Sequence, residues 1–364
     1  MASRTMCTPA WHIRCPTAGS RYGPVCAEQR AEGSAMNSTL CLLFPGQGAY
    51  TEEVFTELGA FRSEVAAVFD EIDRSLIEIG STPVSSTFFN GRPPGLAQLV
   101  REDPDALQVA LYGIAVAVHR ILWNDGLRPR LLIGHSMGEI AALVAAGAFD
   151  VAQGAKVIAA RSEALKPDLG VGGMLALRAD VHRIESLSAS VPSTEWAVAV
   201  ENSPDQTIVS GTEQALVALA NIATAEEILC TRLASPYPFH SPVLRDSVDR
   251  FRNRLAQLPS LAPRPMRCAV YSPILEREYT DADDLLDILP THFTRRVRFH
   301  SGLLQAKADG IRDFVESGAK NTLCALVRKH VGGATALPVV VKGKPVHSTL
   351  AAVAELAATL PGAA

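Results

Sequence analysis

The sequence lacks the features that mark a zinc protein, a disulfide framework or a membrane anchor. Its seven cysteines are scattered, with no CxxC spacing and no cluster of cysteine with histidine, so we expect neither a metal site nor paired disulfides. The longest apolar stretches, such as Ala141–Phe149, are too short to cross a bilayer. These absences favour a reducing, cytoplasmic setting without membrane association.

An excess of charge of one sign is also missing. The net charge of −4 over 364 residues offers no basic surface for nucleic acid. Hydrophobic residues, in contrast, make up 48% of the chain, which is enough for one large core with an inserted smaller unit. Residues 1–35 differ, because they mix proline, glycine, cysteine and arginine without periodicity. We expect a disordered tail or an over-long start there, with Met36 as the alternative first residue and a transit peptide as a further alternative.

Short apolar strands alternate with helical patterns along most of the chain. Ser38–Phe44 and Arg130–Ile133 have the pattern of buried strands, and each runs into a glycine-rich turn. Further strands and helices follow, which is typical of an α/β domain with a mainly parallel sheet. We expect one helix over residues 52–79 and a loop over residues 81–103.

The same pattern predicts how the chain is divided. An α/β core is expected from residues 36–171 and 235–345. Residues 172–234 hold several short strands and a helix, and predict a small α+β subdomain inserted into that core. Residues 346–364 are rich in alanine and predict a C-terminal tail helix.

A G-x-S-x-G motif, Gly-His-Ser-Met-Gly, occupies residues 134–138 between a predicted strand and a predicted helix. Such a turn forces its serine into a strained backbone conformation, and the flanking glycines avoid collisions there. The hydroxyl of Ser136 then projects above the sheet, and the amides at the start of the next helix point toward developing negative charge. The motif therefore predicts that Ser136 is a nucleophile, against a merely structural turn.

A serine nucleophile needs a base. Among nine histidines, His240 is the best candidate because it lies in a proline-rich loop after a strand, although an ordinary surface histidine is the alternative. His135 adjoins the serine, but its side chain should point away from the hydroxyl. No acidic residue has a clear motif context that would complete a triad, and a backbone carbonyl could orient the base instead.

Further motifs accompany the serine turn at residues 134–138. They are Phe44-Pro45-Gly46-Gln47-Gly48, Gln108, Arg161, Gly172-Gly173-Met174, Asn202-Ser203-Pro204-Asp205-Gln206, Phe239-His240-Ser241 and Phe314-Val315-Glu316-Ser317-Gly318. In this combination, over roughly residues 38–332, the chain resembles the malonyl-CoA:acyl carrier protein transacylase family, which includes the acyltransferase domains of polyketide synthases. The resemblance implies a hydrolase-like large domain with a parallel sheet and an inserted small ferredoxin-like subdomain.

The resemblance also implies a role for each matched position. Ser136 would carry the acyl group as an ester, and His240 would act as general base and then as acid. The backbone amides of Tyr50 and Met137 would form the oxyanion hole. The substrate-binding side chains would be those of Arg161, Gln108, Phe239, Gln47 and His135.

Arg161 has a chemical argument of its own. A guanidinium fork binds a carboxylate through two charge-assisted hydrogen bonds, which suits the free carboxylate of malonyl. The alternative is a solvated arginine near the end of a helix. The pair Phe239-His240 resembles that of polyketide acyltransferases that take malonyl, whereas domains that take methylmalonyl tend to have Ser-His, so the resemblance implies a preference for malonyl. The reason would be steric, because a phenyl ring beside the base leaves little room for an α-methyl branch, and such discrimination is worth about 1–3 kcal/mol. Simple packing is the alternative for Phe239.

The implied reaction is transfer of a malonyl or related carboxyacyl group from coenzyme A to the phosphopantetheine thiol of an acyl carrier protein. It would serve fatty acid or polyketide biosynthesis by a ping-pong mechanism, with no metal and no tightly bound cofactor. Two departures from the family's pattern leave open that the substrate carries a larger or unusual acyl unit. Tyr50 stands where the family usually has glutamine, and Pro273 stands where it often has asparagine, at a carbonyl expected to steady the histidine.

Two other functions stay open at this point. An editing thioesterase would use the same serine and base and admit water, although it would have no use for Arg161. A non-catalytic docking protein would only bind a carrier protein. Three arginines, Arg295, Arg296 and Arg298, could face an acidic carrier protein or could simply lie on a solvated strand edge.

Overall fold

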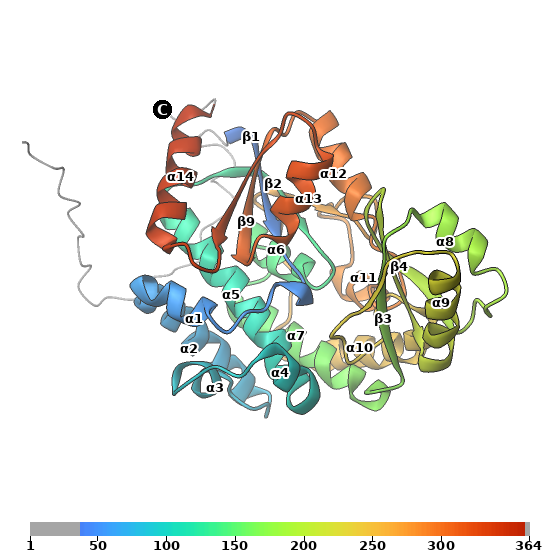
Figure 1. Ribbon diagram of the computed structural model, residues 1–364. Helices are drawn as coiled ribbons and strands as arrows, with labels where there is room; N and C mark the ends of the chain where they lie inside the picture. The colour runs from blue at the N-terminus through green and yellow to red at the C-terminus, as the bar shows by residue number, and fades with distance from the viewer. Residues whose placement is uncertain (1–36, 361–364) are drawn as a thin grey trace, which may run out of the picture. The chain divides into compact units, whose positions relative to one another are not determined.

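The computed structural model describes residues 37–360, apart from the side chains of Asn37, Ser38, Ala60 and Arg62. The expectation for residues 1–35 and the last four residues of the expected tail helix therefore lie outside the described residues. Within the described part of the chain, two sheets form the frame (Figure 1).

The larger sheet has six strands in the order β10-β9-β1-β2-β7-β8. Its strands are β1 (Asn37–Phe44), β2 (Pro129–Gly134), β7 (Ala269–Ser272), β8 (Arg277–Glu278), β9 (Asp313–Ala319) and β10 (Thr335–Val340). All neighbouring pairs run parallel except β7 with β8. The central strands β1, β2 and β9 are buried almost throughout, as expected for a parallel sheet that is covered by helices on both faces.

The helices that pack around this sheet come from both halves of the chain. They are α1 (Val54–Glu57), α2 (Arg62–Glu78), α3 (Ser85–Phe89), α4 (Leu96–Glu102), α5 (Pro104–Asn124), α6 (Gly138–Ala146), α7 (Val151–Leu165), α10 (Arg245–Gln257), α11 (Leu285–Thr291), α12 (Phe299–Ala308), α13 (Thr322–His330) and α14 (Val346–Thr359). Short 3-10 turns are η2 (Gln47–Ala49), η3 (Leu58–Phe61), η4 (Lys166–Asp168) and η5 (Pro242–Leu244).

Helix α5 is the apolar centre of the large domain. Asp103 caps its first turn by accepting a hydrogen bond from the amide of Ala106, and Pro104 occupies the first helical position. Within residues 37–360, α5 is the one helix long and apolar enough to cross a membrane, and 83% of its apolar window is buried inside the protein. A helix that is apolar on all sides is typical of a buried core element.

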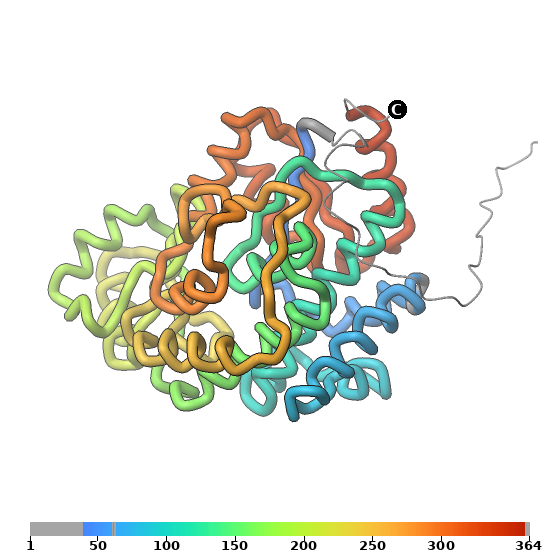
Figure 2. The backbone as a smooth tube through the Cα atoms, turned by 180° about the vertical axis from the view of Figure 1, so that it is seen from behind, coloured from blue at the N-terminus to red at the C-terminus, as the bar shows by residue number. Residues whose placement is uncertain are grey.

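The smaller sheet belongs to an inserted subdomain with its own core. Its elements are β3 (Gly172–Leu177), α8 (Val181–Leu187), β4 (Trp196–Ser203), β5 (Gln206–Thr212), α9 (Glu213–Ala225) and β6 (Cys230–Arg232). The strands are antiparallel in the order β4-β5-β3-β6, which with the βαββαβ chain order makes a ferredoxin-like unit. In Figure 2 this unit is the lobe coloured green to yellow. The predicted fold class is confirmed.

Two local predictions are wrong. Residues 81–103 are not a plain loop, because they contain α3 and α4. The expected helix over residues 52–79 is broken into α1, η3 and α2. Helices of five to seven residues, such as α3 and α4, carry too few periods of apolar spacing to stand out in a sequence, and these two are held by contacts with the core instead.

Candidate active site

The nucleophile elbow joins β2 to α6 through residues 135–137. Ser136 has a φ of +57°, the left-handed conformation that costs energy for any residue other than glycine. The turn is also pressed against the end of β1. A Cβ on Gly138 would lie 2.1 Å from the carbonyl oxygen of Phe44, and a Cβ on Gly134 would lie 2.2 Å from the amide of Glu139. Both glycines are therefore required for the turn to close.

His240 faces Ser136 across the site. Its Nε2 lies 2.7 Å from the Ser136 Oγ, and its Nδ1 lies 2.8 Å from the carbonyl oxygen of Arg295. Because a carbonyl only accepts, Nδ1 carries the proton and Nε2 is left with the lone pair that can take the serine proton. His240 also has a left-handed backbone, with a φ of +60°. Two strained residues are thus held opposite one another.

The orienting carbonyl is not the one that we expected. Pro273 was predicted to steady the histidine, but its carbonyl accepts instead from the amide of Arg298, at 2.8 Å. The carbonyl that holds His240 belongs to Arg295, 55 residues further along the chain. Nothing in the local sequence singles out this peptide, because any residue could supply a backbone oxygen.

Two backbone amides in the segments that follow β1 and β2 are the candidates for an oxyanion hole. Phe44 and Gly134 are register partners at the adjacent carboxyl ends of β1 and β2, so the loop after β1 lies beside the elbow. Within residues 37–360, neither the amide of Tyr50, just after η2, nor that of Met137, at the start of α6, has a hydrogen-bond acceptor. Two free amides beside a helix N-terminus fit a developing oxyanion.

The guanidinium of Arg161 is buried in the same region. Helix α7 begins with a capping box between Asp150 and Gln153, which fixes the register that points Arg161 inward. Arg161 is 5% exposed, and Nη1 donates to Oε1 of Gln108 at 2.6 Å. Burial lowers the pKa of Arg161 to about 10, so the group keeps its charge at neutral pH. No carboxylate pairs with it among the described residues.

Gln108 and Gln47 connect this arginine to the loop after β1. Gln108 donates through Nε2 to Oε1 of Gln47 at 3.1 Å, and Gln47 donates to the carbonyl of Ala234 at 3.2 Å. Both glutamines thus link Arg161 to η2, the turn that ends at Tyr50. Their amide groups are already paired, which makes them fixed parts of the site wall.

Aromatic rings surround the guanidinium. The Arg161 Cζ lies 4.8 Å from the centre of the Phe239 ring and 5.1 Å from that of Phe293. Such cation–π contacts stabilise a buried cation without neutralising it. Phe239 therefore contacts the arginine through its ring and precedes the base in the chain, while its role in substrate selection stays a prediction. Phe293 had no motif to reveal it.

The remaining two predicted residues have other contacts. His135 turns away from the hydroxyl, and its Nε2 lies 2.8 Å from Oδ1 of Asn202 on β4. It thus ties the elbow to the small subdomain. The Tyr50 side chain points away from the serine, because its hydroxyl donates to the carbonyl of Pro94 at 2.6 Å and its ring lies against Phe88. A tyrosine at this position therefore leaves the site wall largely unchanged.

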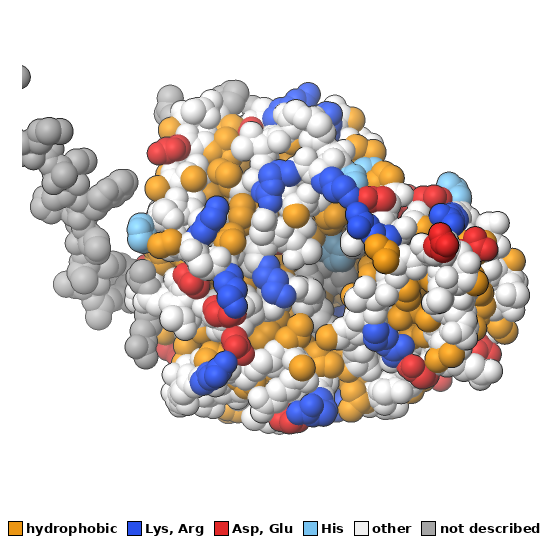
Figure 3. All heavy atoms as spheres, viewed as in Figure 1, with side chains coloured by type: hydrophobic (Ala, Val, Ile, Leu, Met, Phe, Trp, Pro, Cys, Tyr) orange, Lys and Arg blue, Asp and Glu red, His pale blue; other side chains and the backbone are white. Residues whose placement is uncertain are grey.

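Figure 3 shows a hollow where the small subdomain meets the large domain, with histidine atoms in its depth.

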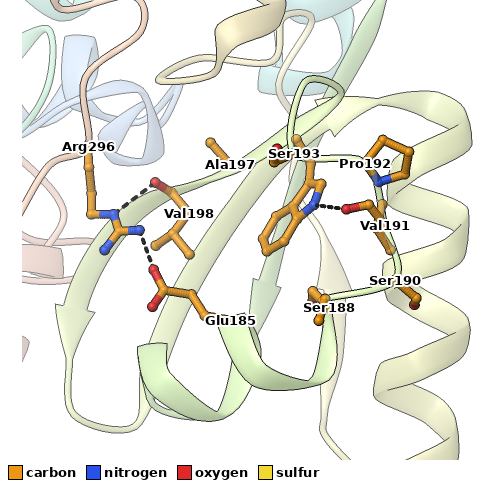
Figure 4. A pocket seen from close by; sticks show the side chains of 11 residues that line it. Glu185, Ser188, Ser190, Val191, Pro192, Ser193, Ala197, Val198 and Arg296 are labelled. Carbon is orange, nitrogen blue, oxygen red and sulfur yellow. Dashed lines mark hydrogen bonds and ion pairs between the residues drawn. The ribbon is translucent and has the colours of Figure 1, made fainter.

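A separate pocket lies on the small subdomain, between residues 188–193, the start of β4 and Arg296 (Figure 4). Arg296 bonds there to the carbonyl of Val198 and forms ion pairs with Glu185 and Glu201. Arg298 is paired as well, with Glu201 and Glu276. Of the three arginines, only Arg295 has no acidic partner among the described residues.

A serine on an elbow at the carboxyl edge of an α/β sheet, facing a histidine, defines the class of enzymes that work through an acyl-serine. The chain matches the family described as acyl transferase domain over residues 42–351. It belongs to this family.

Relatives of known function agree with the match. The chain is 30% identical to a spectinabilin polyketide synthase system protein of Streptomyces orinoci over 332 residues, which cover 88% of this chain and 15% of that protein. It is 29% identical to the 6-methylsalicylic acid synthase of Penicillium patulum, over 79% of this chain and 16% of that protein. The chain thus spans about a sixth of the length of these curated relatives.

Two solved structures have the same fold. One is the acyltransferase domain from the second module of the salinomycin polyketide synthase, with a TM-score of 0.77 and 29% identity over 87% of this chain and 73% of that one. The other is the malonyl CoA-acyl carrier protein transacylase of Coxiella burnetii, with a TM-score of 0.77 and 25% identity over 87% of this chain and 98% of that one. The fold and the family of this chain are those of the acyltransferases of fatty acid and polyketide synthesis.

Proposed function

We propose that the chain transfers a malonyl or closely related carboxyacyl group from coenzyme A to the phosphopantetheine thiol of an acyl carrier protein. One observation carries the choice of acyl group. Among residues 37–360, the buried, charged guanidinium of Arg161 contacts Gln108 and two aromatic faces and has no carboxylate partner, and its charge acts on the nearby base His240. A buried charge without a counter-ion is costly, and the free carboxylate of a bound malonyl group supplies one.

The reaction proceeds in two halves with the same groups. Ser136 Oγ attacks the thioester carbonyl while His240 Nε2 takes its proton, and the amides of Tyr50 and Met137 stabilise the oxyanion. The carbon–sulfur bond then breaks, and His240 returns the proton to the leaving thiolate of coenzyme A. The phosphopantetheine thiol next gives its proton to His240 and attacks the carbonyl carbon of the serine ester. The bond between that carbon and Ser136 Oγ then breaks, His240 returns the proton to Oγ, and the carrier leaves with the acyl group as a thioester. No metal or tightly bound cofactor takes part in these steps.

The test follows the acyl group. The protein is incubated with malonyl-CoA alone and with a phosphopantetheinylated acyl carrier protein, and each species is weighed by mass spectrometry. We expect a malonyl adduct on Ser136 and a loaded carrier. Rapid release of free malonate with no loading of the carrier would show a hydrolase instead, and the absence of any adduct would show a protein that only docks.

The value of kcat/KM should not fall on the acid side of the pH profile, as it does for enzymes whose catalytic histidine has an ordinary pKa. Burial, with the nearby Arg161 charge, lowers the pKa of His240 to about 3, so the imidazole stays neutral as the pH falls. We expect kcat/KM for malonyl-CoA to stay nearly constant from pH 8 to pH 5. A loss of half the activity near pH 6.5 would show that His240 titrates as an exposed histidine does.

Unfolding must be monitored in the same range. The pKa values of the buried His119, His240 and His292 are all lowered, to about 4, 3 and 3. At these three histidines the unfolded chain binds more protons than the folded one below about pH 6.5, so they lower the free energy of unfolding as the pH falls. The raised pKa values of Glu139, about 8, and of Glu316, about 7, act in the opposite direction. Circular dichroism at each pH separates this loss of structure from a loss of catalysis.

Phe239 should restrict the α-carbon of the acyl group. Its buried ring lies against the Arg161 guanidinium and Phe239 precedes His240 in the chain, so Phe239→Ala is expected to improve kcat/KM for methylmalonyl-CoA relative to malonyl-CoA by about 10- to 100-fold. The measurement is a competition between the two thioesters, read from the adducts on Ser136. An unchanged ratio would assign Phe239 to packing alone.

A further inference from the structure

Behind the serine and its base lies a buried polar cluster that the reaction steps leave unused. Glu139 is fully buried in the first turn of α6, and its amide donates to the carbonyl of Ser136 at 3.0 Å. Its Oε2 accepts from the hydroxyl of Tyr279 at 2.8 Å, and that hydroxyl lies 3.2 Å from Nε2 of His292. Three buried polar side chains from separate elements thus meet at one point.

His292 begins a short turn that makes several contacts with the site. The carbonyl of Phe293 accepts from the amide of Ser241, next to the base, at 3.1 Å. The Phe293 ring lies over the Arg161 guanidinium, and the carbonyl of Arg295 accepts from His240 Nδ1. The turn 292–295 therefore holds both the base and one face of the arginine.

The cluster consequently joins the two halves of the catalytic pair. At one end, the backbone amide of Glu139 donates to the carbonyl of Ser136, while its carboxyl belongs to the cluster. At the other end, His292 starts the turn whose Arg295 carbonyl orients His240. Isolated polar groups in a core are costly, so a cluster of three that is buried at this place needs a compensating role. Burial also raises the pKa of Glu139 to about 8, so its carboxyl is mostly protonated at neutral pH and adds no negative charge behind the serine.

We propose that Glu139, Tyr279 and His292 are positioning residues that hold the turn 292–295 against α6 and thereby set the distance between Ser136 and His240. This inference rests on the proposed function only for the identity of the acyl donor. The role is one of positioning, because the three side chains act on the reacting atoms through the backbone of Ser136 and of Arg295.

The experiment compares two buried tyrosines that each donate one hydrogen bond of 2.8 Å. Tyr279→Phe removes the hydroxyl of the cluster, whereas Tyr112→Phe removes a hydroxyl that donates to the carbonyl of Val151 in the core. We expect similar losses of thermal stability. Only Tyr279→Phe should lower kcat, by about 10- to 100-fold with KM little changed, because misplacement of the base slows the chemical step.

A second pair of variants separates position from packing. Glu139→Gln keeps an acceptor for Tyr279 and resembles the protonated acid, so it should recover most of the activity that Glu139→Ala loses. The rate at which a fluorophosphonate labels Ser136 is measured on every variant, since this readout needs no acyl donor. If malonyl-CoA is not a substrate but Tyr279→Phe still slows labelling, the proposed function fails and the positioning role stands. If Tyr279→Phe and Tyr112→Phe label as fast as the unchanged protein, the positioning role is overturned.

Discussion

Replacing Ser136 with alanine is expected to abolish the acyl-enzyme and to lower the rate of acyl transfer by about 10⁴-fold or more. The serine Oγ is the only hydroxyl in the described chain that lies within hydrogen-bond distance of the lone pair on His240. The measurement is the intact mass of the protein after incubation with malonyl-CoA, together with the rate of carrier loading.

The matched control is His240→Ala, which keeps the serine but removes the base. Because a residual attack by serine is still possible with an oxyanion hole in place, this variant should acylate slowly rather than not at all. A Ser136→Ala protein that still gains a malonyl adduct would place the nucleophile elsewhere. Such a result would overturn the mechanism, whereas the fold and the family would be unaffected.

Replacing Arg161 with alanine should reverse the preference among acyl donors. The change removes the buried guanidinium that we propose pairs with the malonyl carboxylate, and we expect kcat/KM for malonyl-CoA to fall by about 100- to 1000-fold. Acetyl-CoA has no free carboxylate that Arg161 could bind, so its kcat/KM should stay the same or rise. The Ser136 adducts formed from an equal mixture of both thioesters give the ratio directly.

Arg161→Lys is the control that separates charge from geometry. Lysine keeps the positive charge but cannot present two parallel donors, so its loss with malonyl-CoA should be intermediate. If both variants lose activity equally with malonyl-CoA and with acetyl-CoA, Arg161 serves the structure through Gln108 and the two phenyl rings. In that case the assignment of the substrate as a carboxyacyl group would have to be withdrawn.

Local patterns in the sequence predicted a large part of the fold. The parallel sheet and the inserted subdomain follow from strands and helices that alternate with clear apolar periods. Helices α3 and α4 escaped notice because they are short, and α11 and α12 because their apolar faces are set by tertiary neighbours. Motifs also singled out Ser136, His240 and Arg161, which the structure brings into one region.

Other parts of the site could not be found in this way. Phe293 and the carbonyl of Arg295 have no signature, since a ring and a peptide oxygen are common to every stretch of chain. The Tyr50 side chain looked like a change to the site wall, yet its hydroxyl turns to Pro94. The expected role of Pro273 failed for the same reason, because several carbonyls near His240 were equally possible by sequence.

The sequence by itself determined what depends on neighbouring residues: the strained serine turn between two glycines, the strand–helix alternation, and the caps that start α5 and α7. Only the tertiary structure decided which distant groups meet in the active site. Ser136 and His240 are 104 residues apart, and His240 is held by a carbonyl 55 residues beyond it. Short-range order follows from backbone sterics and hydrogen bonding along the chain, whereas such distant contacts exist only once packing of the core has overcome the entropy of closing those loops.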